Sequence, residues 1–101
     1  MTNSFETVVY QVVTHPRVAE FAKNNRFPGW FIDSNGCYCC CLGKYLISIF
    51  FNDEDRDLNI TVDSISSEGW FDKNLEWEGC EDDHSLAHTA NRYMAKYATL
   101  V

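Results

Sequence analysis

Large apolar side chains alternate with small or polar ones over residues 36–62, GCYCCCLGKYLISIFFNDEDRDLNITV. Alternation with a period of two is typical of β-strands that bury one face. Gly43 and Lys44 suit a two-residue hairpin turn, because glycine readily adopts the positive φ that such turns need. Residues 53–56 suit a second, four-residue loop. The stretch therefore predicts three consecutive antiparallel strands.

These two turns determine which side chains share a face of the sheet. With them, Leu42 lies opposite Tyr45 and Phe51 lies opposite Leu58. This register places almost every large apolar residue on one face, which we expect to be the core face. That face carries Tyr38, Cys40, Leu42, Tyr45, Ile47, Ile49, Phe51, Leu58, Ile60 and Val62.

The opposite face is less polar than a solvated sheet face usually is. It carries Cys37, Cys39, Cys41, Leu46, Ser48, Phe50, Asn59, Thr61 and Asp63. Two interpretations stay open. Either a nearby loop or the segment 70–77 covers this face, or the face is an interface, since exposed apolar patches usually signify association. The residues available for self-association are Cys37, Cys39, Cys41, Leu46 and Phe50.

Helical spacing precedes the predicted sheet. Asn3 and Glu6 have the spacing of a capping box. An apolar stripe follows at helical intervals, formed by Phe5, Val8, Val9, Val12 and Val13. Pro16 suits the first turn of another short helix, with Thr14 or His15 as its cap. The inner side of that helix carries Val18, Phe21 and Ala22, so we expect two short helices or one kinked helix.

A further strand begins at residues 30–32, and residues 33–36 form a turn before Cys37. If this turn has three residues and a bulge at Gly36, Trp30 and Ile32 share the core face. If it has two residues, Phe31 does so instead. We prefer the three-residue turn, because it keeps the carboxylate of Asp33 away from the core.

The last third of the chain combines a polar stretch with a clear helix. Residues 63–69 are a polar stretch that follows the strand ending at Val62, and we expect residues 70–71 and 75–78 to be strand ends around residues 72–74. Acidic residues 81–83 favour a helix start, where the helix dipole attracts negative charge. The apolar side of this helix carries Leu86, Ala90, Tyr93, Met94, Tyr97 and Val101.

The elements together predict one small acidic α+β domain over residues 1–101. It consists of N-terminal short helices, an antiparallel β-meander of four to five strands, and a C-terminal helix packed on the sheet. A chain of 101 residues has no room for a second domain. The N-terminus lacks the basic region of a secretory signal, so we expect a cytoplasmic protein, in the host cytoplasm if it is phage-encoded.

Charge restricts the class of partner. Fifteen acidic residues against eight basic ones give a net charge of −7. This charge argues against direct binding to nucleic acid, which needs Lys and Arg to neutralise phosphates, and against anionic membranes. It suits a basic protein partner, and a homodimer also remains open.

The sequence predicts neither a catalytic site nor a cofactor. Zinc ligands are available by type, namely Cys37, Cys39, Cys41, Cys80, His84 and His88. However, the cysteine run lacks the usual ligand spacing, and both histidines lie opposite the apolar side of their helix. Acidic neighbours raise the pKa of Cys80, which disfavours a nucleophile. Asp53, Asp55 and Asp57 lack the glycine and glutamate of a calcium loop, so we expect no metal.

Two acidic clusters and three nearby aromatic residues remain as candidate partner-binding residues. They are Asp53, Glu54, Asp55 and Asp57; Glu76, Glu78, Glu81, Asp82 and Asp83; and Trp70, Phe71 and Trp77. Acidic clusters can imitate a phosphate array, and aromatic residues supply binding energy. We therefore expect a non-enzymatic inhibitor that blocks a basic, nucleic-acid-handling protein.

In size, acidity and lack of catalytic motifs, the chain is similar to small phage anti-CRISPR proteins and to immunity proteins of toxin systems. No motif assigns it to either group. Two other classes remain as alternatives. One is a small zinc or thiol protein, and the other is a homodimeric adaptor; both would use the face that carries Cys37, Cys39 and Cys41.

Overall fold

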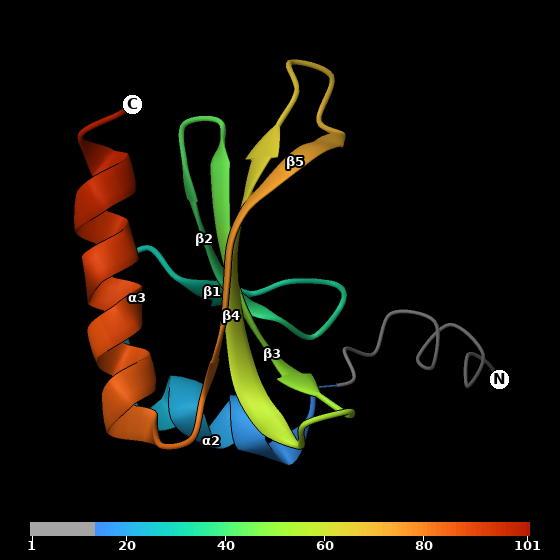
Figure 1. Ribbon diagram of the computed structural model, residues 1–101, viewed down its shortest axis with the longest axis vertical. Coiled ribbons are helices and arrows are strands. Elements are labelled where there is room, and N and C mark those ends of the chain that lie inside the picture. Colours follow the sequence, from blue (N-terminus) through green and yellow to red (C-terminus); the bar gives the residue numbers. More distant parts are fainter. Residues whose placement is uncertain (1–13) are drawn as a thin grey trace, which may run out of the picture.

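The computed structural model describes residues 14–101, which form an α+β fold (Figure 1). The helix expected after Asn3, with its stripe from Phe5 to Val13, lies outside the described residues. The described helices are α2, Pro16–Asn24, and α3, Asp83–Ala98. The strands are β1, Phe31–Ile32; β2, Tyr38–Leu42; β3, Tyr45–Asn52; β4, Asp57–Ile65; and β5, Phe71–Cys80.

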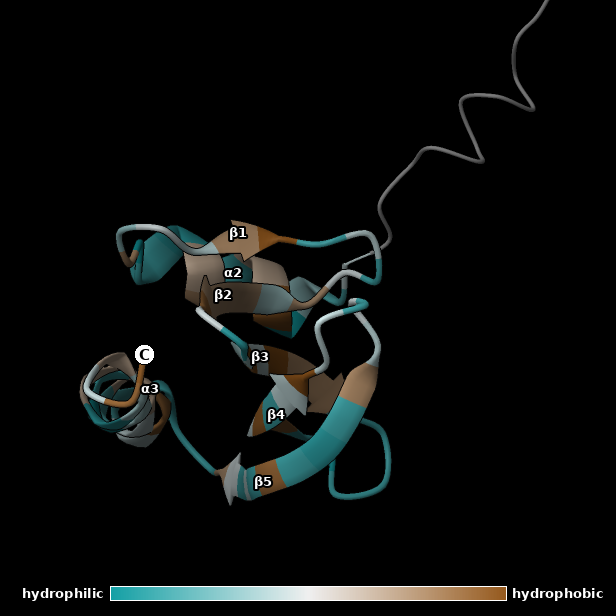
Figure 2. Ribbon diagram, turned by 90° about the horizontal axis from the view of Figure 1, so that it is seen from above, coloured by the Kyte–Doolittle hydropathy of each residue, from teal (hydrophilic) through white to brown (hydrophobic). Residues whose placement is uncertain are grey.

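The strands form one antiparallel sheet in the order β1-β2-β3-β4-β5, so each strand pairs with its neighbours in sequence. Both helices contribute side chains to the core on one face of this sheet, and the sheet curves strongly toward β5 (Figure 2). The opposite face carries no helix of the described residues. We call it the open face. No helix within residues 14–101 is long and apolar enough to cross a membrane.

Both predicted hairpins are confirmed. Leu42 pairs with Tyr45 around a turn in which Gly43 has a φ of +60°. Phe51 pairs with Leu58 around residues 53–56. Because these turns fix the register, the predicted core face is also confirmed. Its central members are fully buried, namely Ile47, Ile49, Leu58, Ile60 and Val62.

The helices cover this face through the side chains that their spacing indicates. Pro16 is the first residue of α2, and the ring Nδ1 of His15 accepts a hydrogen bond from the Arg17 amide at 3.1 Å. Val18 and Phe21 of α2 are buried, as are Leu86, Ala90, Tyr93 and Tyr97 of α3. The prediction for Val101 is wrong, because α3 ends at Ala98 and Val101 is 72% exposed.

The three-residue turn before β2 is confirmed. Ile32 pairs with Tyr38, and the amide of Asp33 donates to the carbonyl of Cys37 at 2.9 Å. The carboxylate of Asp33 stays off the core by accepting the Asn35 and Cys37 amides at 2.9 and 3.0 Å. Trp30 packs against the core, as expected.

The expectation for residues 63–78 is only partly confirmed: residues 71 and 75–78 lie in a strand, but the interruption predicted at 72–74 is wrong. β4 continues to Ile65, and residues 72–74 belong to β5, not to a turn. Two register shifts, between Val62 and Asp63 and between Ser64 and Ile65, leave Leu75 and Asp72 without partners in β4. Such bulges insert an extra residue and interrupt the alternation that identifies a strand in sequence. The real turn follows Ser66, whose carbonyl accepts the Gly69 amide at 2.9 Å.

Candidate functional site

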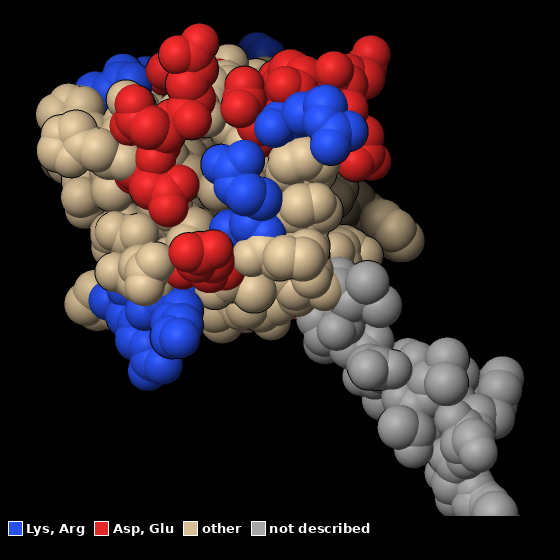
Figure 3. Space-filling model, turned by 90° about the horizontal axis from the view of Figure 1, so that it is seen from below, with Lys and Arg blue, Asp and Glu red and all other residues tan. Residues whose placement is uncertain are grey.

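The two predicted acidic clusters come together, in part, at one end of the molecule. The tip of the β3–β4 hairpin carries the first cluster. Cys80, the last residue of β5, pairs with Leu58 near the start of β4, so residues 81–83 follow beside that tip. Figure 3 views this end and shows acidic side chains in separate groups, with Lys and Arg side chains between and beside them. We call it the acidic end, formed by Asp53, Glu54, Asp55, Asp57, Glu81, Asp82 and Asp83.

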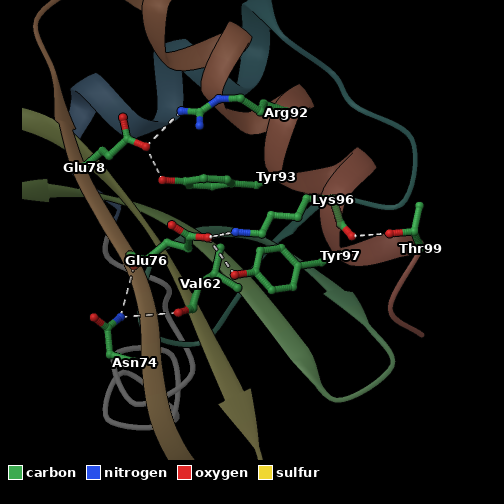
Figure 4. A network of polar contacts seen from close by, with 9 residues as sticks. All are labelled: Val62, Asn74, Glu76, Glu78, Arg92, Tyr93, Lys96, Tyr97 and Thr99. Atoms are coloured by element: carbon green, nitrogen blue, oxygen red, sulfur yellow. Dashed lines mark hydrogen bonds and ion pairs between the residues drawn. The ribbon is translucent and has the colours of Figure 1, made fainter.

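Glu76 and Glu78 do not belong to the acidic end, because their side chains meet α3 (Figure 4). Glu78 accepts hydrogen bonds from Arg92, at 2.9 Å, and from the Tyr93 hydroxyl. Glu76 accepts from Lys96 at 2.5 Å and from the Tyr97 hydroxyl at 2.8 Å. These are the two ion pairs found within residues 14–101.

The pKa values of both carboxyls reflect these partners. The hydrogen bond from Lys96, followed by that from Tyr97, lowers the pKa of Glu76. The hydrogen bond from Tyr93 is the main cause that lowers the pKa of Glu78, and Arg92 adds to it. The two glutamates therefore join β5 to α3, which gives them a structural function.

The acidic hairpin tip is ordered by its own side chains. Asn52 Oδ1 accepts the Glu54 amide at 2.9 Å, and Asp55 Oδ1 accepts the Asp57 amide at 3.0 Å. Asp55 also receives the side-chain amide of Asn59, with Nδ2 at 3.2 Å from Oδ2. Asn59 is only 2% exposed. A buried donor of this kind holds the carboxylate in one position.

Trp77 lies beside this tip on the open face. Its indole Nε1 donates to Asn59 Oδ1 at 2.8 Å, and its ring packs edge-on with Phe50 at a centroid distance of 5.8 Å. The side chain is still 58% exposed. Thus Asn59 connects Trp77 to Asp55. Alternation in the sequence placed Asn59 on this face, but gave no signal of its burial, because β5 was not predicted as a continuous strand.

Trp70 and Phe71 lie far from the acidic end. They belong to the β4–β5 hairpin at the upper end of the molecule in Figure 1, whereas the β3–β4 tip lies at the lower end. Their side chains are 72% and 71% exposed. The structure therefore brings one of the three predicted aromatic residues, Trp77, to the acidic surface and leaves the other two at the opposite end.

The cysteines of the open face differ in exposure. Cys39 is 1% exposed, Cys37 is half-buried and Cys41 is exposed. Burial raises the pKa of Cys39 to about 12, with the charge of Asp33 adding to the effect. Burial also raises the pKa of Cys37. Leu46 and Phe50 are half-buried, and Trp77 covers part of Phe50, so self-association through this face stays a prediction.

The remaining candidate ligands are separate. His84 and His88 are exposed on α3, and Cys80 is buried. Burial is the main cause that raises the pKa of Cys80, and the charges of Glu78 and Asp82 add to it. Within residues 14–101, no three His, Cys, Asp or Glu side chains are placed to hold a metal ion.

A cavity of about 280 Å³ adjoins the acidic end. It lies between the start of α2, the β1–β2 loop and the end of β3, and its lining includes Phe50, Phe51 and Asp53. One wall is stiffened by His15, whose ring stacks on Phe51 at a centroid distance of 3.8 Å. Phe50 thus borders the cavity and also contacts Trp77.

Comparison of the chain with protein-family models, with curated proteins and with solved structures found no significant match.

Proposed function

We propose that this protein is a non-enzymatic inhibitor that binds a basic, nucleic-acid-handling protein through its acidic end. One observation carries the proposal. Carboxylates from two separate chain segments converge at this end, and neither ion pair found within residues 14–101 uses any of them. Their charge is thus available to a partner. Asp82 also caps α3, accepting the Ser85 amide at 2.7 Å.

The chemistry of this surface favours a basic protein. Carboxylates held close together repel one another and attract Lys and Arg side chains that otherwise bind phosphates. Asp53 and Asp55 stand on an exposed tip that projects from the sheet, so they can enter a groove. A partner occupied in this way is blocked from nucleic acid. Association driven by charge is fast and weakens as salt concentration rises.

The proposal includes the class of inhibitor. Small size and strong acidity favour an anti-defence protein of the anti-CRISPR type, encoded by a phage and acting in the host cytoplasm by imitating nucleic acid. The alternative is a toxin-immunity protein, which would use the same acidic surface to bind a basic nuclease toxin. The identity of the partner distinguishes the two.

A homodimeric adaptor is a second candidate, favoured by exposed aromatic side chains on or beside the open face. Phe31 is 48% exposed and Phe71 is 71% exposed. Measuring the molar mass in solution at micromolar concentration tests this candidate. A dimer that Phe71→Asp converts to a folded monomer would support it, whereas a monomeric wild-type protein would exclude it.

The inhibitor is tested in two steps. The tagged protein first captures its partner from a lysate of its native host. Competition between the purified protein and a DNA or RNA duplex for that partner is then measured. The double variant Asp53→Lys/Asp55→Lys should bind the partner at least about tenfold more weakly, because it reverses charge at the contact.

The matched control is Glu68→Lys/Asp72→Lys, which changes net charge equally at the opposite hairpin. We expect the control to bind nearly as tightly as the wild type. Equal loss in both variants would show that only overall charge matters. Full binding by the Asp53/Asp55 variant, or simultaneous binding of protein and duplex, would contradict the proposal.

A further inference from the structure

Trp77 and Asp55 both bind the side chain of a single buried residue, Asn59. Asn59 accepts the indole N–H of Trp77 at 2.8 Å with its Oδ1 and donates to Asp55 Oδ2 at 3.2 Å with its Nδ2. One side-chain amide therefore fixes both an aromatic ring and a carboxylate. Because Asn59 is 2% exposed, water has little access to this amide, and only one orientation of the amide satisfies both partners.

Each of the two groups has a second contact that limits its movement. Phe50 packs edge-on with the Trp77 ring, and the Asp57 amide donates to Asp55 Oδ1 at 3.0 Å. Both groups nevertheless reach solvent, since Trp77 is 58% exposed and Asp55 is exposed. They form an ordered, accessible pair. Binding of a ligand to both therefore costs little side-chain entropy, because the two side chains are already held in place.

Gly79 leaves the space that this pair requires. It lies opposite Asn59 in the β4–β5 ladder. A Cβ atom at Gly79 would come within 3.3 Å of Asp55 Oδ2 and within 3.4 Å of Asn59 Nδ2. A Cβ atom alone would make the Asp55 carboxylate shift by a few tenths of an ångström, and a branched side chain such as valine would crowd its contact with Asn59 further.

An aromatic ring beside a fixed carboxylate matches one side chain especially well. The guanidinium group of arginine is planar, stacks on an indole ring, and donates N–H groups in its own plane to a carboxylate. A lysine ammonium has no plane to stack, and it is more strongly hydrated. The negative charge of the surrounding acidic end further favours a cation.

We propose that Trp77 and Asp55 form a recognition site for an arginine side chain of a basic protein partner. This inference rests on the proposed function and specifies what the acidic end recognises. Trp77 stacks on the guanidinium group, and Asp55 accepts its N–H groups. Asn59 acts as a positioning residue for both.

The test uses the full chain and three blocked tripeptides, acetyl-Gly-X-Gly-amide, in which X is arginine, lysine or citrulline. Citrulline has the shape of arginine without its charge. Binding is followed by nuclear magnetic resonance, through the indole N–H signal of Trp77 and the backbone signals of residues 53–57. We expect saturable shifts with arginine, binding about threefold or more weaker with lysine, and no saturation with citrulline.

Variants locate the site. Trp77→Leu and Asp55→Asn should each weaken arginine binding by about threefold to tenfold, whereas Trp70→Leu and Asp72→Asn, both at the opposite hairpin, should not. Gly79→Val keeps both contacting groups but should also weaken binding, by displacing Asp55. Asn59→Ala removes the hydrogen bond to the Trp77 indole N–H. This variant should therefore shift or broaden the Trp77 indole signal even in the absence of peptide.

Several outcomes would overturn the inference. Saturable binding of citrulline would remove the charge requirement, and unchanged binding to Trp77→Leu would place the peptide elsewhere. Failure of the arginine site can be distinguished from failure of the proposed function. If the peptides do not bind but Asp53→Lys/Asp55→Lys still releases the captured partner, only the arginine site is wrong. If arginine binds here but the charge reversal leaves the captured partner bound, the inhibitor proposal is wrong.

Discussion

Asn59 reaches back along its own hairpin to hold the carboxylate of Asp55, with 3.2 Å between the amide nitrogen and Oδ2. It also accepts the indole N–H of Trp77 at 2.8 Å. Removing this side chain leaves the Asp55 carboxylate and the Trp77 indole N–H to find water as a partner, and it opens a small space under Trp77. We expect Asn59→Ala to lower the free energy of unfolding by about 1–3 kcal/mol.

Urea unfolding, followed by far-ultraviolet circular dichroism, measures this loss. The control is Asn91→Ala, an exposed position on α3, which should not destabilise the protein and should stabilise it by no more than about 0.7 kcal/mol, because alanine is the better helix former. A change at Asn59 no larger than at Asn91 would show that the network contributes little to folding.

Tyr38 connects α2 to the sheet through its hydroxyl group. The hydroxyl donates to the Asn25 carbonyl at 2.6 Å and accepts the Phe27 amide at 3.0 Å, while the ring is only 4% exposed. Tyr38→Phe removes both bonds and leaves the Phe27 amide and the Asn25 carbonyl with only the 3.1 Å backbone bond between them. We expect a loss of about 1–3 kcal/mol in unfolding free energy.

Tyr45→Phe is the matched control for Tyr38→Phe. Within the described residues, the Tyr45 hydroxyl makes no hydrogen bond, so this variant should lose less than about 0.5 kcal/mol. Thermal unfolding of the two variants, side by side, gives the comparison. Equal stability of the two would show that water replaces the bonds to Asn25 and Phe27.

Gly43 occupies a backbone conformation that other residues adopt with strain. Its φ is +60°, and a Cβ atom there would lie 2.9 Å from a methyl carbon of Val101. We expect Gly43→Ala to destabilise the protein by about 1–2 kcal/mol. Gly43→Asn should cost less, because asparagine tolerates this conformation better. Chemical denaturation measures the unfolding free energy of both variants. A larger loss in Gly43→Asn than in Gly43→Ala would contradict the conformational explanation.

Acid should weaken the contact between β5 and α3. The pKa values of Glu76 and Glu78 are lowered in the folded protein, so these groups stabilise it above the ordinary glutamate pKa, about 4.3. That contribution is lost as pH falls from about 5 through the lowered pKa values. Stability measured between pH 7 and pH 3 should therefore fall less steeply in Glu76→Gln/Glu78→Gln.

Glu54→Gln/Glu68→Gln is the control for this pH series, because both residues are exposed and removing them changes the net charge by the same amount. Its stability should keep the pH dependence of the wild type. A flattened curve in the control as well would attribute acid sensitivity to overall charge.

Thiol alkylation should follow exposure along β2. Cys41 is exposed, whereas Cys39 is 1% exposed and its pKa is raised to about 12 by burial, so little thiolate forms there. Iodoacetamide at pH 8 should modify Cys41 first and Cys39 much later. Peptide mass spectrometry over time measures the order, and denatured protein provides the reference in which both react. Equal rates in the folded protein would contradict the buried position of Cys39.

Much of the sheet could be predicted because its turns are short and its alternation is strict. Gly43 and the loop at 53–56 fix the register of three strands, and the register alone separates core side chains such as Ile47 and Ile60 from those of the open face. The caps of both helices could be predicted for the same reason, because each cap residue binds an amide only two or three residues further along the chain. These features depend on neighbours in sequence, so a sequence pattern can reveal them.

The second half of the sheet could not be predicted in this way. Leu75 and Asp72 are extra residues at bulges, and they shift the alternation of β5 twice. Without the correct path of β5, neither the burial of Asn59 nor its bond to Trp77 could be derived. The pairing of Glu76 and Glu78 with α3 was missed for the same reason, because it depends on which side of β5 faces the helix.

The bulges of β5 have a consequence for contacts between molecules. β5 is an outer strand of the sheet and is ten residues long, which is a length at which exposed backbone groups can template aggregation. Two interruptions of register, with the charged side chains of Lys73, Glu76 and Glu78 between and after them, make this edge a poor match for another regular strand. The irregularity that hides β5 from sequence analysis therefore also protects the protein from fibrillar stacking.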